Sequence, residues 1–194
     1  MQVTDELMKE HQMILKYLEL MERYIEFTKA SRRENILLEK TQDFISFIQV
    51  FTDTYHHAKE EDVLFKYMQA PGVLSHCNPL PVMLSEHEQG RMYVLNMINA
   101  VANMNVDSLY ESIYGYCQLL KQHVFKEDNV LYSMAENGLS DEDKIAIESE
   151  YQQIEGKLDK QAVWNYYEEK YSALENYLDS EISITESQRG QAAV

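Results

Sequence analysis

Residues 56–65 read HHAKEEDVLF, and residues 123–132 read HVFKEDNVLY. In both stretches a histidine is followed four positions later by a glutamate, as in His57 with Glu61 and His123 with Glu127. Residues i and i+4 lie one above the other on an α-helix, so each pair presents a ring nitrogen and a carboxylate to the same point. The pattern therefore predicts two helices that carry metal-binding or catalytic groups on one face.

Four parts of the chain carry stripes of residues at alternating spacings of three and four, as in helices that pack into a bundle. Because the connections between them are short, we predict an all-α, up-down-up-down four-helix bundle with one or two additional C-terminal helices. The stripes are Leu7, His11, Ile14, Leu18, Met21 and Ile25; Phe47, Val50, Thr54, His57, Glu61, Leu64 and Met68; Leu80, Leu84, His87, Arg91, Val94, Ile98 and Val101; and Leu109, Ile113, Tyr116, Leu120, His123, Glu127, Val130 and Met134.

The composition agrees with long helices and excludes several classes of function. Of 194 residues only 6 are Gly and 3 are Pro, which disfavours turn-rich β folds. A formal net charge of −16 disfavours binding to nucleic acid or to anionic membranes. Two cysteines without a C-x-x-C pair, no signal peptide and no long apolar run predict a soluble protein of the reducing cytoplasm.

Capping residues and prolines give the expected boundaries. Thr4 is expected to cap the first helix, Ser31 with Glu34 to form a capping box for the second, and Asn105 or Asp107 to cap the fourth. The three prolines fall in a break at residues 69–81, where His76 is expected to be exposed. We therefore predict a metal-binding bundle at 1–138, a helical extension packed on it at 139–180, and a flexible tail at 181–194.

Each stripe is interrupted by a titratable side chain, which is costly to bury unless it is paired or bound to a cation. A histidine on all four helices, twice with a glutamate at i+4, predicts a metal site. If each of two ions takes two imidazoles and both carboxylates bridge, a coordination position stays open. Nitrogen and oxygen donors without thiolate favour iron, with manganese or zinc as alternatives. The predicted ligands are His11, His57, Glu61, His87, His123 and Glu127.

At these residues the chain resembles the hemerythrin-like, or HHE cation-binding, family. The resemblance rests on Glu10-His11, residues 56–65, Glu86-His87-Glu88 and residues 123–132, and it spans about Leu7 to Met134. It implies a non-haem di-iron centre, oxo- or hydroxo-bridged, inside a four-helix bundle. In the oxygen-carrying members a second histidine follows four residues after the one on the third helix. Here that position is Arg91, so the chain resembles instead the bacterial hemerythrin-like proteins and the di-iron proteins of iron–sulfur repair.

Several side chains near the predicted ligands have more than one interpretation. His56 and Glu60 also satisfy H-x-x-x-E but lie one residue off the stripe, so they either orient ligands, lie at the surface or bind the metal directly. Glu88, next to His87, is a candidate ligand or a residue that orients one. Arg91 either neutralises a carboxylate, attracts an anionic ligand or extends to the surface. Each nearby tyrosine either supplies a phenolate ligand or packs in the core; these are Tyr55, Tyr93, Tyr114 and Tyr116.

The pattern leaves several functions open. The first is a protein that binds dioxygen, peroxide or nitric oxide for sensing, storage or detoxification. The second is an enzyme that consumes peroxide or nitric oxide, or a protein that repairs iron–sulfur centres or donates iron. Turnover needs an external electron donor, expected to be a protein redox partner, because no flavin or nicotinamide motif is present. A bundle whose buried polar groups only bond to one another is the structural alternative.

Overall fold

The computed structural model describes residues 2–74 and 77–192, with side chains as far as residue 188, so His76 lies outside the described part. Every regular element there is helical, with no strand, which confirms the all-α prediction. No helix in this part is long and apolar enough to span a bilayer. The elements, with π-helical segments labelled η, are α1 (Asp5–Ser31), α2 (Glu34–Phe47), η1 (Ile48–His57), η2 (Glu60–Leu64), α3 (Phe65–Met68), α4 (Leu80–Ala102), α5 (Val106–Lys126), η3 (Glu127–Leu131), α6 (Tyr132–Gly138), α7 (Asp141–Leu158) and α8 (Lys160–Ala192).

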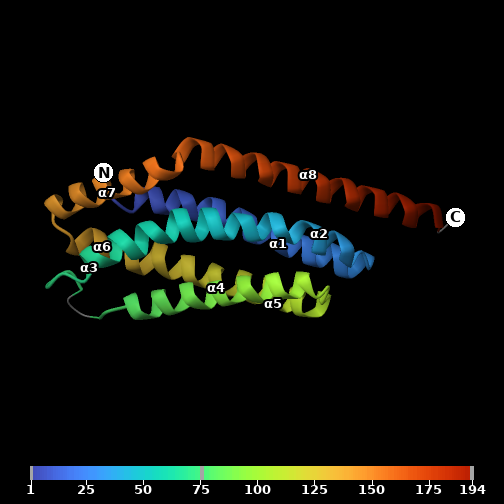
Figure 1. Ribbon diagram of the computed structural model, residues 1–194, viewed down its shortest axis with the longest axis horizontal. Helices are drawn as coiled ribbons and strands as arrows, with labels where there is room; N and C mark the ends of the chain where they lie inside the picture. Colours follow the sequence, from blue (N-terminus) through green and yellow to red (C-terminus); the bar gives the residue numbers. More distant parts are fainter. Residues whose placement is uncertain (1, 75–76, 193–194) are drawn as a thin grey trace.

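The longest elements lie side by side along the long axis of the molecule (Figure 1). α1 contacts α2 and α5, and α4 contacts α2 and α5. α8 packs on α1 and α2 and extends past the end of the bundle in the view of Figure 1. The helices therefore form a bundle whose interior is shared by α1, the α2–η1–η2 segment, α4 and the α5–η3 segment.

Of the predicted caps, the one at Asn105 is present, the one at Ser31 is wrong, and Thr4 lies at the N-cap position of α1 without a side-chain cap bond. The amide of Ser108 donates to the side chain of Asn105 at 3.1 Å, as expected for the start of α5. The capping box predicted for Ser31 is wrong, because Ser31 is the last residue of α1 and its hydroxyl donates to the carbonyl of Phe27. The turn is made instead at Arg32, which has a left-handed backbone (φ 56°).

Two apolar clusters fill the interior, and a layer of buried polar residues separates them. The larger cluster lies along the middle of the bundle and includes Tyr17, Phe47 and Phe51. The smaller cluster includes Leu64 and Phe65. Along each inner segment the polar residues fall between members of the two clusters: His11 between Leu7 and Ile14, Glu60 between Tyr55 and Val63, His87 between Met83 and Val94, and His123 and Glu127 between Leu120 and Leu131.

The buried face of the second helix differs from the predicted stripe. Val50 is 36% exposed, and Phe51 and Tyr55 are buried in place of Val50 and Thr54. The cause is η1, since a π-helix bonds i to i+5 and so takes more residues per turn than the α-helix assumed in the prediction. The same shift follows η3, where Val130 is 51% exposed and its neighbour is buried.

The buried face of α4 is shifted by one residue from the predicted stripe at several positions. Met83, Gly90 and Met97 are buried, whereas the predicted stripe had the residues one position later. At two of these three positions the following residue is apolar as well, so periodicity alone could not decide which of the two neighbours faces inward. Gly90 faces α5, where a Cβ atom would meet Leu120 and Tyr116 at 3.5 Å, an ordinary contact distance.

The C-terminal extension is longer than the sequence suggested. The helical extension does not end at residue 180 as predicted, because α8 continues to Ala192; residues 193 and 194 of the predicted tail lie outside the described part. Buried tyrosines of α1 hold it to the bundle: Tyr17 donates to the carbonyl of Tyr167 at 2.7 Å, and Tyr24 to that of Leu174 at 2.8 Å. At the start of α7, Ser140 and Asp143 form a capping box.

Two helical glycines make a matched test of the packing between α4 and α5. A Cβ atom at Gly115 would lie 2.4 Å from Cε1 of Tyr93, whereas one at Gly156 would meet nothing within 4 Å. We expect Gly156→Ala to raise the free energy of unfolding by about 0.5–1 kcal/mol through helix propensity. Gly115→Ala should lower it by about 1 kcal/mol, because overpacking outweighs that gain.

Urea unfolding of both variants measures the two effects. The Tyr93→Ala change combined with Gly115→Ala should cost less than the sum of the single changes, since the clash is then removed. Equal stabilisation by both glycine substitutions would contradict the close contact.

Candidate metal centre

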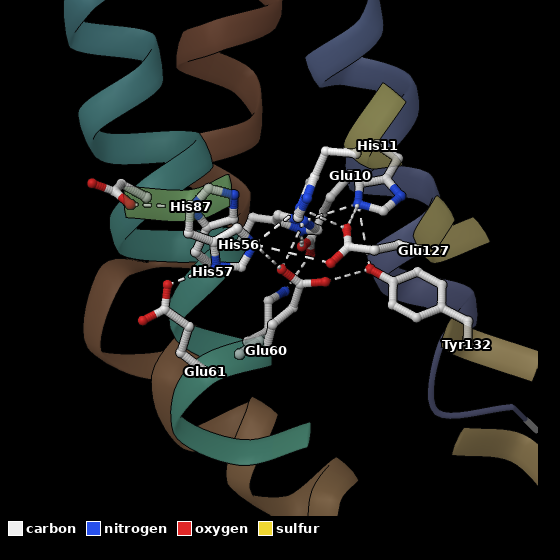
Figure 2. A network of polar contacts seen from close by, with 12 residues as sticks. Glu10, His11, His56, His57, Glu60, Glu61, His87, Glu127 and Tyr132 are labelled. Carbon is white, nitrogen blue, oxygen red and sulfur yellow. Dashed lines mark hydrogen bonds and ion pairs between the residues drawn. The ribbon is translucent and has the colours of Figure 1, made fainter. Parts of the chain in front are cut away.

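Five histidines and two glutamates, Glu60 and Glu127, form the inner part of the buried polar layer, which also contains Glu10. Each inner segment of the bundle supplies at least one of the seven (Figure 2). α1 supplies His11, α4 supplies His87 and α5 supplies His123. The π-helical segments supply the others, and η2 and η3 begin at the two glutamates themselves. π-helical turns often occur at functional sites, and here they turn His56, His57, Glu60 and Glu127 inward.

The donor atoms form two overlapping groups, within each of which all lie within 4.8 Å of one another. The three-histidine group consists of His57, His87, His123 and Glu60. The two-histidine group consists of His11, His56, Glu60 and Glu127. Glu60 belongs to both, so its carboxylate lies where a bridge between two ions would be.

Five of the six predicted ligands lie in these groups, and Glu61 does not. Its side chain is 26% exposed, and Oε1 accepts from Nδ1 of His87 at 2.7 Å and from Arg91 at 2.6 Å. Glu60 and His56, which the sequence left outside the stripe, are buried in the centre instead. The physical reason is again the π-helical turns of η1 and η2, which change the helical phase that a uniform spacing assumes, so that Glu60 and not Glu61 faces inward. Ligation of a metal by these residues stays a prediction.

The two inner carboxylates lack hydrogen-bond partners for most of their oxygens. Oε2 of Glu60 and both oxygens of Glu127 are buried and accept no hydrogen bond of normal geometry. Nε2 of His123 and of His11 lie 3.1 and 3.3 Å from Oε2 of Glu127, but without the alignment that a hydrogen bond requires. A buried carboxylate left in this way costs several kcal/mol, and a bound cation removes that cost.

Each of the five imidazoles donates Nδ1–H to a carboxylate at 2.6–3.1 Å. Such a contact fixes the tautomer that leaves Nε2 free as a ligand atom and is typical of metal-binding histidines. The pairs are His11 with Asp128, His56 with Glu10, His57 with Asp53, His87 with Glu61, and His123 with Glu86.

The free nitrogens face one another in pairs. Nε2 of His11 lies 3.0 Å from that of His56, and Nε2 of His87 lies 2.9 Å from that of His123. When the only ring proton of each imidazole is on Nδ1, both atoms of a pair present lone pairs, and a hydrogen bond between them needs an additional proton. A shared cation satisfies both lone pairs at once.

Without a cation, protons are unevenly shared in the cluster. Burial lowers the pKa values of His56 and His57 well below the usual range. Burial also opposes the charge on His11, but the hydrogen bond to Asp128 and the nearby carboxylate of Glu127 outweigh it and raise the pKa to about 9. Burial and the neighbouring Glu127 raise the pKa of Glu60. These opposed shifts arise from many titratable groups in one dry space, as in metal and catalytic sites.

Three cations neutralise the carboxylates that hold the imidazoles. Lys59 is fully buried and pairs with Glu10, and Lys126 pairs with Glu86. Arg91 donates to Asp53 at 3.0 Å and to Glu61 at 2.6 Å. The structure therefore agrees with the interpretation that Arg91 neutralises carboxylates, although part of its side chain is exposed.

The tyrosine nearest the centre is Tyr132, which the sequence analysis did not consider. Its hydroxyl donates to Oε1 of Glu60 at 2.6 Å and lies 3.3 Å from Nε2 of His11. Of the tyrosines weighed earlier, Tyr55 bonds to Glu155, and Tyr114 is exposed. Glu88 is also exposed and lies 3.6 Å from Arg91.

The contacts repeat between the two halves of the bundle, and this repeat is the signal that could have found the missed residues. Aligning residues 56–65 with 123–132 pairs His56 with His123 and Glu60 with Glu127. Glu10, which precedes His11, accepts from His56 and pairs with Lys59. In the same way, Glu86, which precedes His87, accepts from His123 and pairs with Lys126. Phe65 stacks on His87, and Tyr132 on His11, in the same way.

The donor set fits iron, manganese or zinc bound by nitrogen and oxygen. Neither cysteine takes part, since Cys117 is buried against the carbonyl of Leu18, and Cys77 is exposed. Two ions fit the two groups better than one, because the donors divide into sets of four that share a carboxylate.

Adjacent glutamates give the sharpest test of this arrangement. Glu60→Gln should reduce the bound metal from two ions per chain to one or fewer, because it removes the shared charged ligand. Glu61→Gln should keep two ions and weaken affinity by about 10–100-fold, as loss of a group that orients a ligand does. Metal analysis after gel filtration, with competition by a chelator, measures both. Greater loss in the Glu61 variant would contradict the observed register.

Comparison with known proteins agrees with the geometry. Residues 2–135, more than half of the chain, match the family described as the hemerythrin HHE cation binding domain. Searches among curated proteins and solved structures give no significant match. The matched segment ends within α6 and contains all seven buried histidines and glutamates of the two groups. The chain therefore belongs to the hemerythrin HHE cation-binding domain family.

Proposed function

We propose that this protein holds two iron ions and uses them to bind dioxygen, peroxide or nitric oxide. The observation that carries the proposal is the pair of buried carboxylates, Glu60 and Glu127, three of whose four oxygens lack a hydrogen-bond partner and which lie among five imidazoles. We take the bundle to be of the up-down-up-down type, with Glu60 and Glu127 as the carboxylates that would hold the ions. Bound iron supplies a redox-active Lewis acid with an open coordination position for a small ligand.

The charge of the surroundings supports two divalent ions. Seven carboxylates contact the five imidazoles, and three cations, Lys59, Arg91 and Lys126, pair with members of that set. Four negative charges are left, which two divalent cations neutralise. The carboxylates are Glu10, Asp53, Glu60, Glu61, Glu86, Glu127 and Asp128.

The number of imidazoles changes one expectation. The sequence predicted four, one fewer than in oxygen carriers, because Arg91 occupies the fourth position after His87. His56 brings the number of inward imidazoles to five. A missing histidine therefore no longer separates this chain from reversible oxygen carriers, and all three small ligands remain within the proposal. We propose sensing, storage or detoxification as the role of binding.

Removal of the metal should destabilise the protein strongly. The inner carboxylates and paired nitrogens lose their common partner, so the free energy of unfolding should fall by at least about 3 kcal/mol at saturating metal. For a chain of this size that corresponds to a lowering of Tm by roughly 6–12 °C. Calorimetry before and after anaerobic chelation measures the change. An unchanged Tm would favour a bundle whose polar layer is only structural.

Ligand titration separates binding from turnover. Protein reduced under anaerobic conditions and reconstituted with iron should take up about one equivalent of nitric oxide or peroxide per di-iron site. Continued consumption with a reductant present would show an enzyme, and loss of iron to an acceptor would show a donating role. Failure to take up iron on anaerobic reconstitution would refute the proposal.

A further inference from the structure

The repeat between the two halves of the centre breaks at one place. His57, Asp53 and Arg91 form a connected set, in which Asp53 accepts from both of the others at 3.1 and 3.0 Å. The equivalent positions in the other half are Val124, Leu120 and Leu15, none of which can form such contacts. The symmetric contacts hold the centre together, so the asymmetric set is the part that needs a separate explanation.

A small cavity lies at the same place. It is lined by Asp53, His57, His87, Gly90, Arg91 and Tyr116, so all three members of the asymmetric set border it. Its free volume of about 10 Å³ is room for one water-sized molecule. The cavity thus reaches from a partly exposed ion pair to two imidazoles of the three-histidine group. A larger cavity of about 190 Å³ near Glu6 and Lys160 touches none of the five imidazoles.

The walls of this cavity suit a small uncharged molecule. Ile48 and Val94 add aliphatic surface, and Gly90 leaves the space that a side chain would fill. We take the mouth of the cavity to be at Arg91, the lining residue whose side chain is partly exposed. Arg91 pairs there with Asp53, Glu61 and Glu88, so one cation faces three carboxylates. Its Nε and Nη2 atoms already donate to carboxylates, which leaves the mouth with a net negative charge.

We propose that this cavity is the route by which the small ligand reaches the metal centre, and that its acidic mouth favours uncharged molecules such as nitric oxide over anions such as azide. This inference rests on the proposed function. Arg91 is a positioning and specificity residue here, since it holds the two carboxylates that orient His57 and His87 and narrows the opening between them.

The size of the route is tested at Gly90. A Cβ atom there would meet Leu120 and Tyr116 at 3.5 Å, which is ordinary contact, so Gly90→Ala should fold and should occupy part of the cavity. Stopped-flow association of nitric oxide with the iron-loaded protein should slow by at least about threefold, since a dry packed interior leaves no other space for the added methyl. Gly156→Ala is the matched control and should leave the rate unchanged.

The charge of the mouth is tested at Glu88, which is 68% exposed and touches no imidazole in the structure. Glu88→Gln should speed azide association by about threefold and leave nitric oxide association unchanged, because only the anion is repelled. In the wild-type protein, added salt should speed azide association by screening the same repulsion.

Three outcomes would overturn the inference. The first is an unchanged nitric oxide rate in Gly90→Ala with two irons still bound. The second is azide association that slows with added salt. The third needs no metal: a lower Tm of metal-free Gly90→Ala would show that the free space is absent. Failure of the proposed function gives a different result, namely wild-type protein that takes up no iron or binds neither probe.

Discussion

Two buried carboxylates, on Glu60 and Glu127, set the requirements for the rest of the structure, because three of their four oxygens lack a hydrogen-bond partner. They lie at the depth of the core, in a layer that interrupts the packing between two apolar clusters. A helical bundle gains nothing in stability from such a layer unless a cation balances it. The surrounding features, from the five imidazoles to the three outer cations, follow as ways to hold ligand atoms in place around those two groups.

The two-fold repeat explains how one bundle builds a centre with many parts. Each half supplies a Glu-His pair on one helix and an H-x-x-K-E stretch on another, and each half completes the contacts of the other. The aromatic residue five positions after the inner glutamate covers a ring in both halves. Against this repeat, the set formed by Asp53, His57 and Arg91 marks one side of the centre as different. The cavity lies on that side.

Much of the fold could be read from the sequence, because the spacings of three and four and the scarcity of Gly and Pro have one simple explanation in packed helices. His11, His87 and His123 could be placed inward for the same reason. The choice between Glu60 and Glu61 could not, because it depends on π-helical turns that periodicity analysis does not include. Adjacent candidates, such as Val50 and Phe51, leave the pattern open to a shift of one residue. The length of α8 was missed because its polar C-terminal part carries little apolar periodicity.

The most direct test of the central claim is anomalous diffraction at the iron absorption edge from crystals of the iron-loaded protein. The account predicts two anomalous peaks in the polar layer. One should lie within coordination distance of His57, His87 and His123, and the other of His11 and His56, with Glu60 touching both. A single peak, or a peak coordinated by Glu61 while Glu60 stays unbound, would contradict it.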